Sequence, residues 1–203
     1  METHTYEEKN LELALEKAAY ELGLTQDNIL INNITEKNGL LKKSVTIEVI
    51  SLQELIKYLK NSINEILEIM NIKANLETRV REKTIEIKIF SDNNAILIGK
   101  NGHNMKALQI IMKQILKNKT KADIHLILDV ENYKEKRIKH LEILAKKTAR
   151  EVAKTKVETK LDSMNSYERR IIHNLLNDHK YVYTESIGEE PNRCIVIKPK
   201  DNK

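Results

Sequence analysis

Two glycines three residues apart, set between two apolar segments, constrain this chain more than any other feature of its sequence. They lie in the segment Ile96-Leu-Ile-Gly-Lys-Asn-Gly-His103. Asn93 and Asn94 before it are suited to open a short helix, and the apolar spacing from Met105 to Leu116 predicts a second, amphipathic helix. Glycines in the turn between two such helices allow the backbone to approach a ligand closely, because they carry no Cβ.

The same turn has the chemistry of an anion-binding site. The free amides at the start of the second helix and the helix dipole favour a negatively charged group, and Lys100 adds a mobile positive charge. A sugar-phosphate backbone satisfies these features, as in the KH module, whose GxxG loop clamps single-stranded nucleic acid. The candidate RNA contacts are Gly99, Lys100, Asn101, Gly102 and, on the following helix, Lys106. A plain turn between two helices is the alternative that the spacing alone leaves open.

The predicted elements around this turn favour the nucleic-acid interpretation. A helix from Leu52 to Met70 and strands at 75–81 and 84–90 precede it, and a strand at 124–130 follows it. The resulting order, α-β-β-α-GxxG-α-β, resembles the type II KH arrangement of bacterial proteins. A GxxG turn that arose by chance would predict neither the strand pair nor the closing strand. A second interpretation of residues 52–72 is a connector helix that sets the spacing between domains.

The N-terminal part is predicted to form an acidic α-β-β unit. The pattern predicts a helix over 8–22, then strands at 28–34 and 45–50 joined by a turn at Lys37-Asn38-Gly39. About fifty residues are a marginal size for an independent core, so we expect this unit to pack against a neighbour or, in a homodimer, against its own copy. Its first fifty residues contain five Lys and Arg against nine Asp and Glu. This balance leaves open a protein-docking scaffold in which nucleic-acid binding is secondary.

The C-terminal part is predicted to begin with a long, basic helix. The predicted elements are a helix over 133–160, a turn-rich break at 161–166, a helix over 167–178, and strands at 181–186 and 194–198. The apolar stripe of the first helix consists of Ile138, Leu141, Ala145, Ala149 and Val152. Ser166 is suited to cap the second helix. Residues 131–203 contain seventeen Lys and Arg against twelve Asp and Glu, which favours a polyanionic partner.

Arg169, Arg170 and His173 are the second group of candidate RNA contacts. Arg169 and His173 lie four residues apart on the predicted helix and therefore share one face. A guanidinium and an imidazole on one exposed face can hold a phosphate and stack under a base or a sugar. A solvated helix face without a binding role is the alternative, because Arg-x-x-x-His is common by chance.

Several separate motifs in one order resemble the Jag family of bacterial RNA-binding proteins, also called KhpB. They are Ile98-Gly-Lys-Asn-Gly102, Ala107-Leu-Gln109, Leu128-Asp-Val-Glu-Asn-Tyr-Lys-Glu-Lys-Arg137, Met164-Asn-Ser-Tyr-Glu-Arg-Arg-Ile-Ile-His173 and Gly188-Glu-Glu-Pro-Asn-Arg193. The resemblance covers residues 93–198, about half the chain. It implies an α+β protein of three small domains: an N-terminal domain (1–51), a type II KH domain (52–130) and an Arg-x-x-x-His domain (131–203).

The resemblance also implies a function. Members of this family are RNA-binding regulators linked to cell elongation, division or envelope growth, and they often work with a second small KH protein. The expected ligand is single-stranded RNA, with DNA a less favoured alternative, because neither motif requires a contact with the 2′-hydroxyl.

Three departures from the family pattern affect these expectations. Residues 37–43 retain only one glycine of the family's Gly-rich turn, so the role of that turn is open. Residues 161–166 lack the prolines that often precede the Arg-rich helix, and we expect a looser junction there. Cys194 stands where the family tends to have a basic residue, which removes one charge from the last strand.

The sequence does not favour an enzyme, a metal site or a cofactor. It has no Walker-type loop, no Cys/His metal spacing and no Gly-x-Ser-x-Gly motif. Glu168 and His173 could act as an acid-base pair, but no nucleophile accompanies them. With one Phe, seven Tyr and no Trp, the chain is also poorly suited to hold bases on a platform of stacked aromatic rings.

Compartment is predicted from cysteine content and from apolar runs. Cys194 is the only cysteine, which excludes an internal disulfide and fits a reducing compartment, with a buried free thiol. The N-terminus lacks the pattern of a signal peptide, and no apolar run approaches the length of a membrane span. We therefore expect a cytoplasmic protein without membrane insertion.

Overall fold

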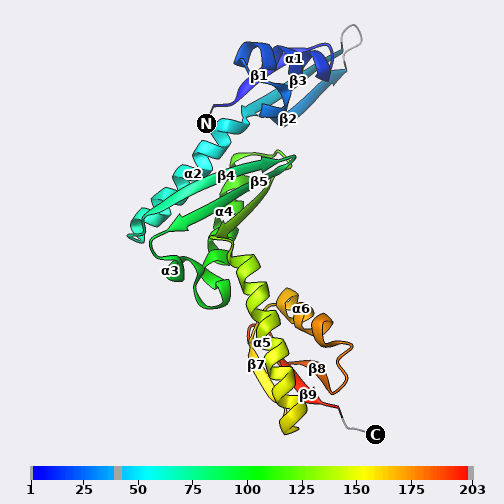
Figure 1. Cartoon of the computed structure of the whole chain (residues 1–203). Coiled ribbons are helices and arrows are strands. Elements are labelled where there is room, and N and C mark those ends of the chain that lie inside the picture. Colours follow the sequence, from blue (N-terminus) through cyan, green and yellow to red (C-terminus); the bar gives the residue numbers. More distant parts are fainter. Residues whose placement is uncertain (1, 39–42, 201–203) are drawn as a thin grey trace. The chain divides into compact units, whose positions relative to one another are not determined.

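Helices and strands alternate along the chain in a computed structural model that describes residues 2–38 and 43–200 (Figure 1). The predicted α+β class is confirmed. The chain divides into two units, Met1–Glu131 and Asn132–Lys203. The described residues form three separate three-stranded sheets, two in the first unit and one in the second.

The first sheet contains a strand that the sequence pattern did not predict. The elements are β1 (His4–Glu8), α1 (Leu11–Leu22), β2 (Ile29–Asn38) and β3 (Lys43–Ser51), and the strand order is β1-β3-β2, all antiparallel. The expected α-β-β order is therefore wrong and the observed order is β-α-β-β. Only Tyr6 of β1 is buried, so the strand shows no apolar alternation that would have revealed it.

Helix α1 starts later than predicted because Asn10 caps it. The side chain of Asn10 accepts a hydrogen bond from the Leu13 amide at 2.9 Å, which ends any helical continuation towards residue 8. Ala14 and Ala18 face the sheet and share a core with residues of all three strands: Tyr6, Ile29, Ile47 and Val49. Of the predicted turn at Lys37-Asn38-Gly39, Lys37 and Asn38 belong to strand β2, and Gly39 lies outside the described residues.

The elements around the glycine turn follow the expected order. They are α2 (Leu52–Ile69), β4 (Ala74–Arg81), β5 (Thr84–Ser91), α3 (Asn94–Ile98), α4 (His103–Lys119) and β6 (His125–Val130). In the sheet, β5 is central: it pairs antiparallel with β4 and parallel with β6. The alternation of Ile85, Ile87 and Ile89 predicted one buried face, and all three side chains are fully buried. Helix α4 contacts β6, and α2 contacts both α4 and β4.

The second unit also contains an unpredicted strand. Its elements are α5 (Tyr133–Thr155), β7 (Thr159–Ser163), α6 (Ser166–Leu176), β8 (Val182–Ile187) and β9 (Cys194–Pro199), with strand order β7-β9-β8. The long helix ends at Thr155, where Lys156 takes a left-handed conformation (φ 61°). The first half of the turn-rich break expected at 161–166 is the end of strand β7, which pairs antiparallel with β9. Because only Leu161 of β7 is buried, local alternation could not identify the strand.

One core joins α5, α6 and the sheet of the second unit. Its buried members are Leu141, Ala145, Ala149, Val152, Leu161, Met164, Ile172, Leu176, Val182, Ile195 and Ile197. Four of the five residues in the predicted stripe of α5 belong to it; the fifth, Ile138, is half-buried. Cys194 is buried (1% exposed) as a free thiol, as predicted.

Candidate nucleic-acid interface

The turn between α3 and α4 has a backbone that requires glycine. Asn93 caps α3, as expected, by accepting a hydrogen bond from the Ile96 amide at 3.4 Å. The helix ends at Gly99, whose φ of 68° and ψ of 178° lie in a region that essentially only glycine occupies. Gly102, with a φ of 79°, is left-handed and buried, and its amide donates to the Gly99 carbonyl at 3.2 Å. The turn is therefore a closed, tight loop that begins and ends on glycine.

Asn104 adds a steric reason for glycine at position 99. Its side chain donates a hydrogen bond to the Ile96 carbonyl at 2.8 Å, so it folds back across the loop. A Cβ on Gly99 would lie 2.6 Å from Asn104 Cγ, closer than two carbon atoms can approach. Asn104 was not predicted from the sequence as a residue of the site. A polar residue in the first turn of the second helix was the only signal for it.

The loop carries an exposed lysine, and the histidine after the loop is held by a hydrogen bond to the loop backbone. Lys100 is exposed, and Asn101 is half-buried in a left-handed conformation (φ 53°). The Lys100 carbonyl lies 2.6 Å from Nδ1 of His103, and a carbonyl can only accept, so Nδ1 carries the proton in this contact. Lys106 is exposed one turn along α4. Of the two lysines predicted from the sequence, Lys100 therefore lies within the loop and Lys106 on the helix that follows it.

Arg169 does not lie on an exposed face as predicted. Its side chain is 8% exposed, and its guanidinium donates to the Met164 carbonyl at 2.7 Å and to Oε1 of Glu190 at 2.9 Å. The guanidinium thus joins the start of α6 to the turn before β9. Burial is possible because each of these hydrogen bonds compensates for lost hydration. Arg169 and His173 share a helix, but only His173 is exposed.

Glu168 is likewise occupied in holding α6. The helix begins with a capping box: the Asn165 side chain accepts from the Glu168 amide at 3.0 Å, and the Glu168 carboxylate accepts from the Asn165 amide at 3.2 Å. Asn165 is therefore the cap, and the expectation of Ser166 is wrong. The other oxygen of Glu168 accepts from Arg137 of α5 at 2.8 Å. Burial raises the pKa of Tyr133, which also lies close enough to Arg137 and Glu168 to feel their charges.

The exposed side of α6 carries Tyr167, Arg170 and His173. Tyr167 is 63% exposed and was not identified from the sequence. The His173 ring is fixed by β8, because its Nδ1 lies 2.7 Å from Oγ1 of Thr184. These three side chains offer an aromatic ring, a guanidinium and an oriented imidazole. Arg169 supports this surface from the buried side.

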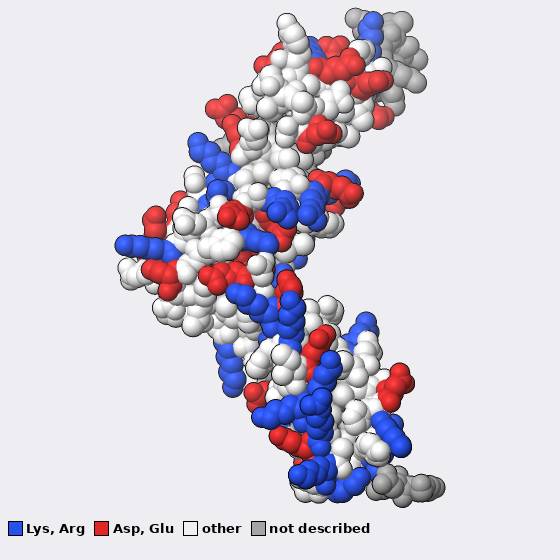
Figure 2. All heavy atoms as spheres, viewed as in Figure 1, with Lys and Arg blue, Asp and Glu red and all other residues white. Residues whose placement is uncertain are grey.

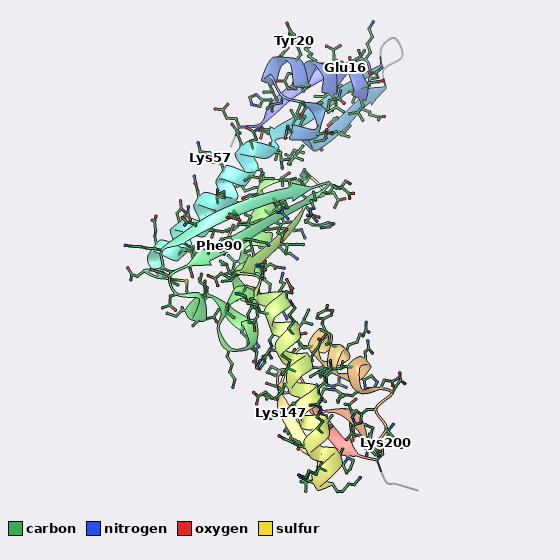
Figure 3. The ribbon with its side chains drawn as sticks, in the orientation of Figure 1. Glu16, Tyr20, Lys57, Phe90, Lys147 and Lys200 are labelled. Atoms are coloured by element: carbon green, nitrogen blue, oxygen red, sulfur yellow. The ribbon has the colours of Figure 1, made fainter. Side chains whose placement is uncertain are left out.

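Helix α5 adds a basic surface to the second unit. Figure 2 shows Lys and Arg gathered over this helix, and Lys147 extends from it in Figure 3. The exposed cations along α5 include Lys139, Lys146, Lys147, Arg150 and Lys154. Lys139 forms an ion pair with Glu135, with 2.7 Å between Nζ and Oε1. The acidic residues of α5 are too few to pair with all of its cations.

A metal site and a membrane-spanning helix are two alternative features that the described residues lack. Within residues 2–38 and 43–200, no group of three or more His, Cys, Asp or Glu side chains is arranged to hold a metal ion. In the same described ranges, no helix has the length and apolar character needed to cross a bilayer.

Comparison with known proteins identifies the family. Residues 139–199 match the model of the R-3-H domain, which is named for its Arg-x-x-x-His motif. The chain is 35% identical to RNA-binding protein KhpB of Clostridium symbiosum, over 98% of this chain and 93% of that protein. It is 33% identical to RNA-binding protein KhpB of Bacillus subtilis (strain 168), over 95% of this chain and 96% of that protein. Because these identities extend over nearly the full length of both relatives, the chain belongs to the KhpB family, as the resemblance to Jag proteins predicted.

Proposed function

We propose that this protein binds single-stranded RNA at two sites, the loop of residues 99–102 and the exposed side of α6. The observation that carries the proposal is the loop itself, in which Gly99 takes a backbone conformation that favours glycine, next to the Asn104 side chain, and Lys100 is exposed beside the start of α4. The match to the Arg-x-x-x-His domain model and the names of the relatives support RNA as the ligand. No arrangement among the described residues favours a catalytic role.

At the loop, the strand is held through its phosphates. Gly99 and Gly102 let a sugar-phosphate backbone lie against the protein backbone, and the first amides of α4 point towards it. Lys100 and Lys106 neutralise phosphate charge from either side. A KH loop of this kind holds about four nucleotides, and the type II KH domain proposed here comprises residues 52–130, with α2 as its first helix.

At α6, Arg170 and His173 contact the strand. Arg170 binds a phosphate, and the His173 ring, oriented by Thr184, stacks under a base or a sugar. Tyr167 adds a second stacking surface. Arg169, the first residue of the Arg-x-x-x-His motif, acts as a positioning residue, because its guanidinium is occupied by Met164 and Glu190. This site belongs to the proposed domain of residues 131–203.

The biological role proposed from the family is post-transcriptional regulation in the cytoplasm, linked to cell elongation, division or envelope growth. A second small KH protein and a second copy of this chain are the proposed protein partners. Two RNA sites on one chain suit such a regulator, because binding one strand at both sites raises affinity by roughly 10²–10⁴ without a new contact.

Docking of a partner through the N-terminal residues 1–51 is the second candidate function. Figure 3 shows Glu16 and Tyr20 extending outward from α1, and Tyr20 is 89% exposed. Leu13, 41% exposed, lies on the same side of the helix. In this case Leu13→Ser/Tyr20→Ser would abolish cellular function and leave RNA affinity unchanged. Loss of RNA affinity in that variant would exclude a separate docking role.

Fluorescence anisotropy with short single-stranded RNA tests the RNA-binding proposal. The loop variant is Lys100→Asp/Asn101→Asp, which places two carboxylates where phosphates would lie. The matched control is Lys57→Asp/Asn61→Asp, because both residues are exposed on α2 and undergo the same chemical changes. We expect the loop variant to weaken binding by about tenfold or more, and the control to bind nearly as the wild type does. Equal affinity of the two variants would refute the loop as an RNA site.

A further inference from the structure

A cavity of about 560 Å³ lies at the far end of α4 from the glycine loop. Its walls are the last two turns of α4, the connection from residue 120 to residue 124, and the start of β6. No residue of the predicted RNA sites lines it. It is therefore a separate feature of the first unit.

The cavity has an apolar floor and a cationic rim. Leu116 and Leu126 lie beneath the floor and are 5% and 1% exposed, and the half-buried Ala122 and Ile124 supply its accessible apolar surface. Lys117, Lys121 and His125 line the opening with exposed side chains. Such a combination suits a ligand with a flat apolar ring and an attached phosphate.

Asp123, the acidic residue that lines the cavity, does not repel an anionic ligand. Asp123 is paired with Lys83, whose Nζ lies 3.0 Å from its carboxylate. This hydrogen bond lowers the pKa of Asp123, so the carboxylate is ionised but its charge is compensated locally. The rim lysines are left to interact with a ligand.

A ridge of exposed side chains on α4 connects the loop to the cavity. Its members recur every three or four residues and so lie on one face of the helix: His103, Lys106, Ile110, Lys113 and Lys117. Ile110 is 59% exposed, although it is apolar. At 1.5 Å per residue, the ridge is about 20 Å long. On this path, one apolar side chain, Ile110, lies between Lys106 on one side and Lys113 and Lys117 on the other.

The wall of the cavity is held in place by a residue distant in sequence. Asn32, at the irregularity in the pairing of β2 with β3, accepts a hydrogen bond from the Lys121 amide at 2.7 Å and from Oγ1 of Thr120 at 3.2 Å. Oγ1 of Thr120 in turn accepts from the Ala122 amide at 3.0 Å. A connection ordered in this way loses less conformational entropy when a ligand binds.

We infer that this cavity holds a nucleotide of the same RNA strand that the glycine loop clamps. The base rests on Ala122 and Ile124, and Lys117 and Lys121 bind its phosphate. The inference rests on the proposed function of the loop and extends its footprint along α4. About 20 Å corresponds to about six nucleotides at the stacked spacing of 3.4 Å per nucleotide, so only strands longer than the loop's own footprint reach the cavity.

A length series of oligouridylates tests this inference. Anisotropy is measured for 4-, 8- and 12-nucleotide strands with full-length protein that carries Arg170→Ala/His173→Ala, so that the α6 site does not contribute to any gain with length. The cavity variant is Lys117→Glu/Lys121→Glu. Its control, Lys57→Glu/Lys60→Glu, makes the same charge change on α2.

The dependence of RNA affinity on strand length should distinguish the cavity variant from the loop variant. The cavity variant binds the 4-nucleotide strand within about twofold of its parent but loses the roughly tenfold gain that the parent shows with longer strands. The loop variant weakens binding at every length. A cavity variant that follows its parent at all lengths would overturn the inference and leave the loop proposal intact, whereas a parent that binds no strand would overturn both.

Cross-linking gives an independent readout. In a 12-nucleotide strand with one 4-thiouridine at successive positions, one position should cross-link to residues 113–126 and a different one to the loop. Cross-links confined to the loop at every position would also overturn the inference.

Discussion

Single residues decide the shape of the proposed RNA-binding loop. Gly99 is constrained twice, by its dihedral angles and by the Asn104 side chain that crosses the loop. The sequence could suggest the first constraint, because glycines in a turn commonly take positive φ. It could not suggest the second, since the contact depends on how α3 and α4 are placed.

Replacing Gly99 with alanine should therefore cost more stability than replacing another left-handed glycine. Gly23→Ala is the control, because Gly23 has a φ of 63° and no atom within 4 Å of the added Cβ. We expect about 1 kcal/mol for Gly23→Ala and at least about 3 kcal/mol for Gly99→Ala, which adds a steric clash to the strain. Urea unfolding measures both values, and a similar loss in the two variants would contradict the importance of Asn104.

Arg169 and Arg170 are neighbours with opposite expected behaviour. Arg169→Ala leaves the Met164 carbonyl without its donor and should lower the free energy of unfolding by about 1–3 kcal/mol. The ion pair with Glu190 adds little, because the Glu190 side chain is 62% exposed. Arg170→Ala should change stability by less than about 0.5 kcal/mol and should weaken RNA binding. Urea unfolding measures the stability of the two variants, and anisotropy measures their RNA affinity. A larger loss of stability in Arg170→Ala than in Arg169→Ala would contradict the assignment of a structural role to Arg169.

At the scale of elements, strong local patterns were predictable and short polar strands were not. Helices α2 and α5 and strand β5 have continuous periodicity, and the sequence placed each of them correctly apart from their ends. Strands β1 and β7 bury one residue each, Tyr6 and Leu161. They exist because a distant strand, β3 or β9, offers hydrogen bonds, and single-sequence periodicity contains no information about such a partner.

The junction of α5 and α6 depends on Glu168, which accepts hydrogen bonds from both Asn165 and Arg137. Glu168→Ala leaves both donors without an acceptor and should destabilise the protein by about 3–5 kcal/mol. Glu168→Gln keeps one acceptor oxygen and the side-chain volume, so its loss should be clearly smaller. Thermal unfolding of both variants tests this order. Equal losses would mean that the charge of Glu168, and not its two hydrogen bonds, holds the junction.

At the scale of the whole molecule, charge is divided unevenly along the chain. The acidic residues 1–50 precede two basic stretches, and each proposed RNA site lies in a basic stretch. The order of these stretches was readable from the sequence, and so was the family. The burial of Arg169 was not, because the pattern Arg-x-x-x-His does not state which side of the helix faces the core.

RNA affinity should fall steeply with salt, because phosphate contacts release bound cations. For single strands, the slope of log affinity against log salt concentration is about −0.7 for each phosphate neutralised. Lys100→Asp/Asn101→Asp should make this slope shallower, and Leu13→Ser/Tyr20→Ser should leave it unchanged. Anisotropy titrations at several salt concentrations give the slopes, and a loop variant with the wild-type slope would argue against phosphate contacts there.

The most direct test of the two-site account is a double-variant cycle on one long single-stranded RNA. Dissociation constants are measured for the wild type, for Lys100→Asp/Asn101→Asp, for Arg170→Ala/His173→Ala and for the combined variant. If both sites hold one strand, either variant alone removes the gain from simultaneous binding and should lose roughly 10²–10⁴ in affinity, whereas each of two independent sites of similar affinity would lose only about twofold. A combined variant that binds RNA as tightly as the wild type would contradict the account.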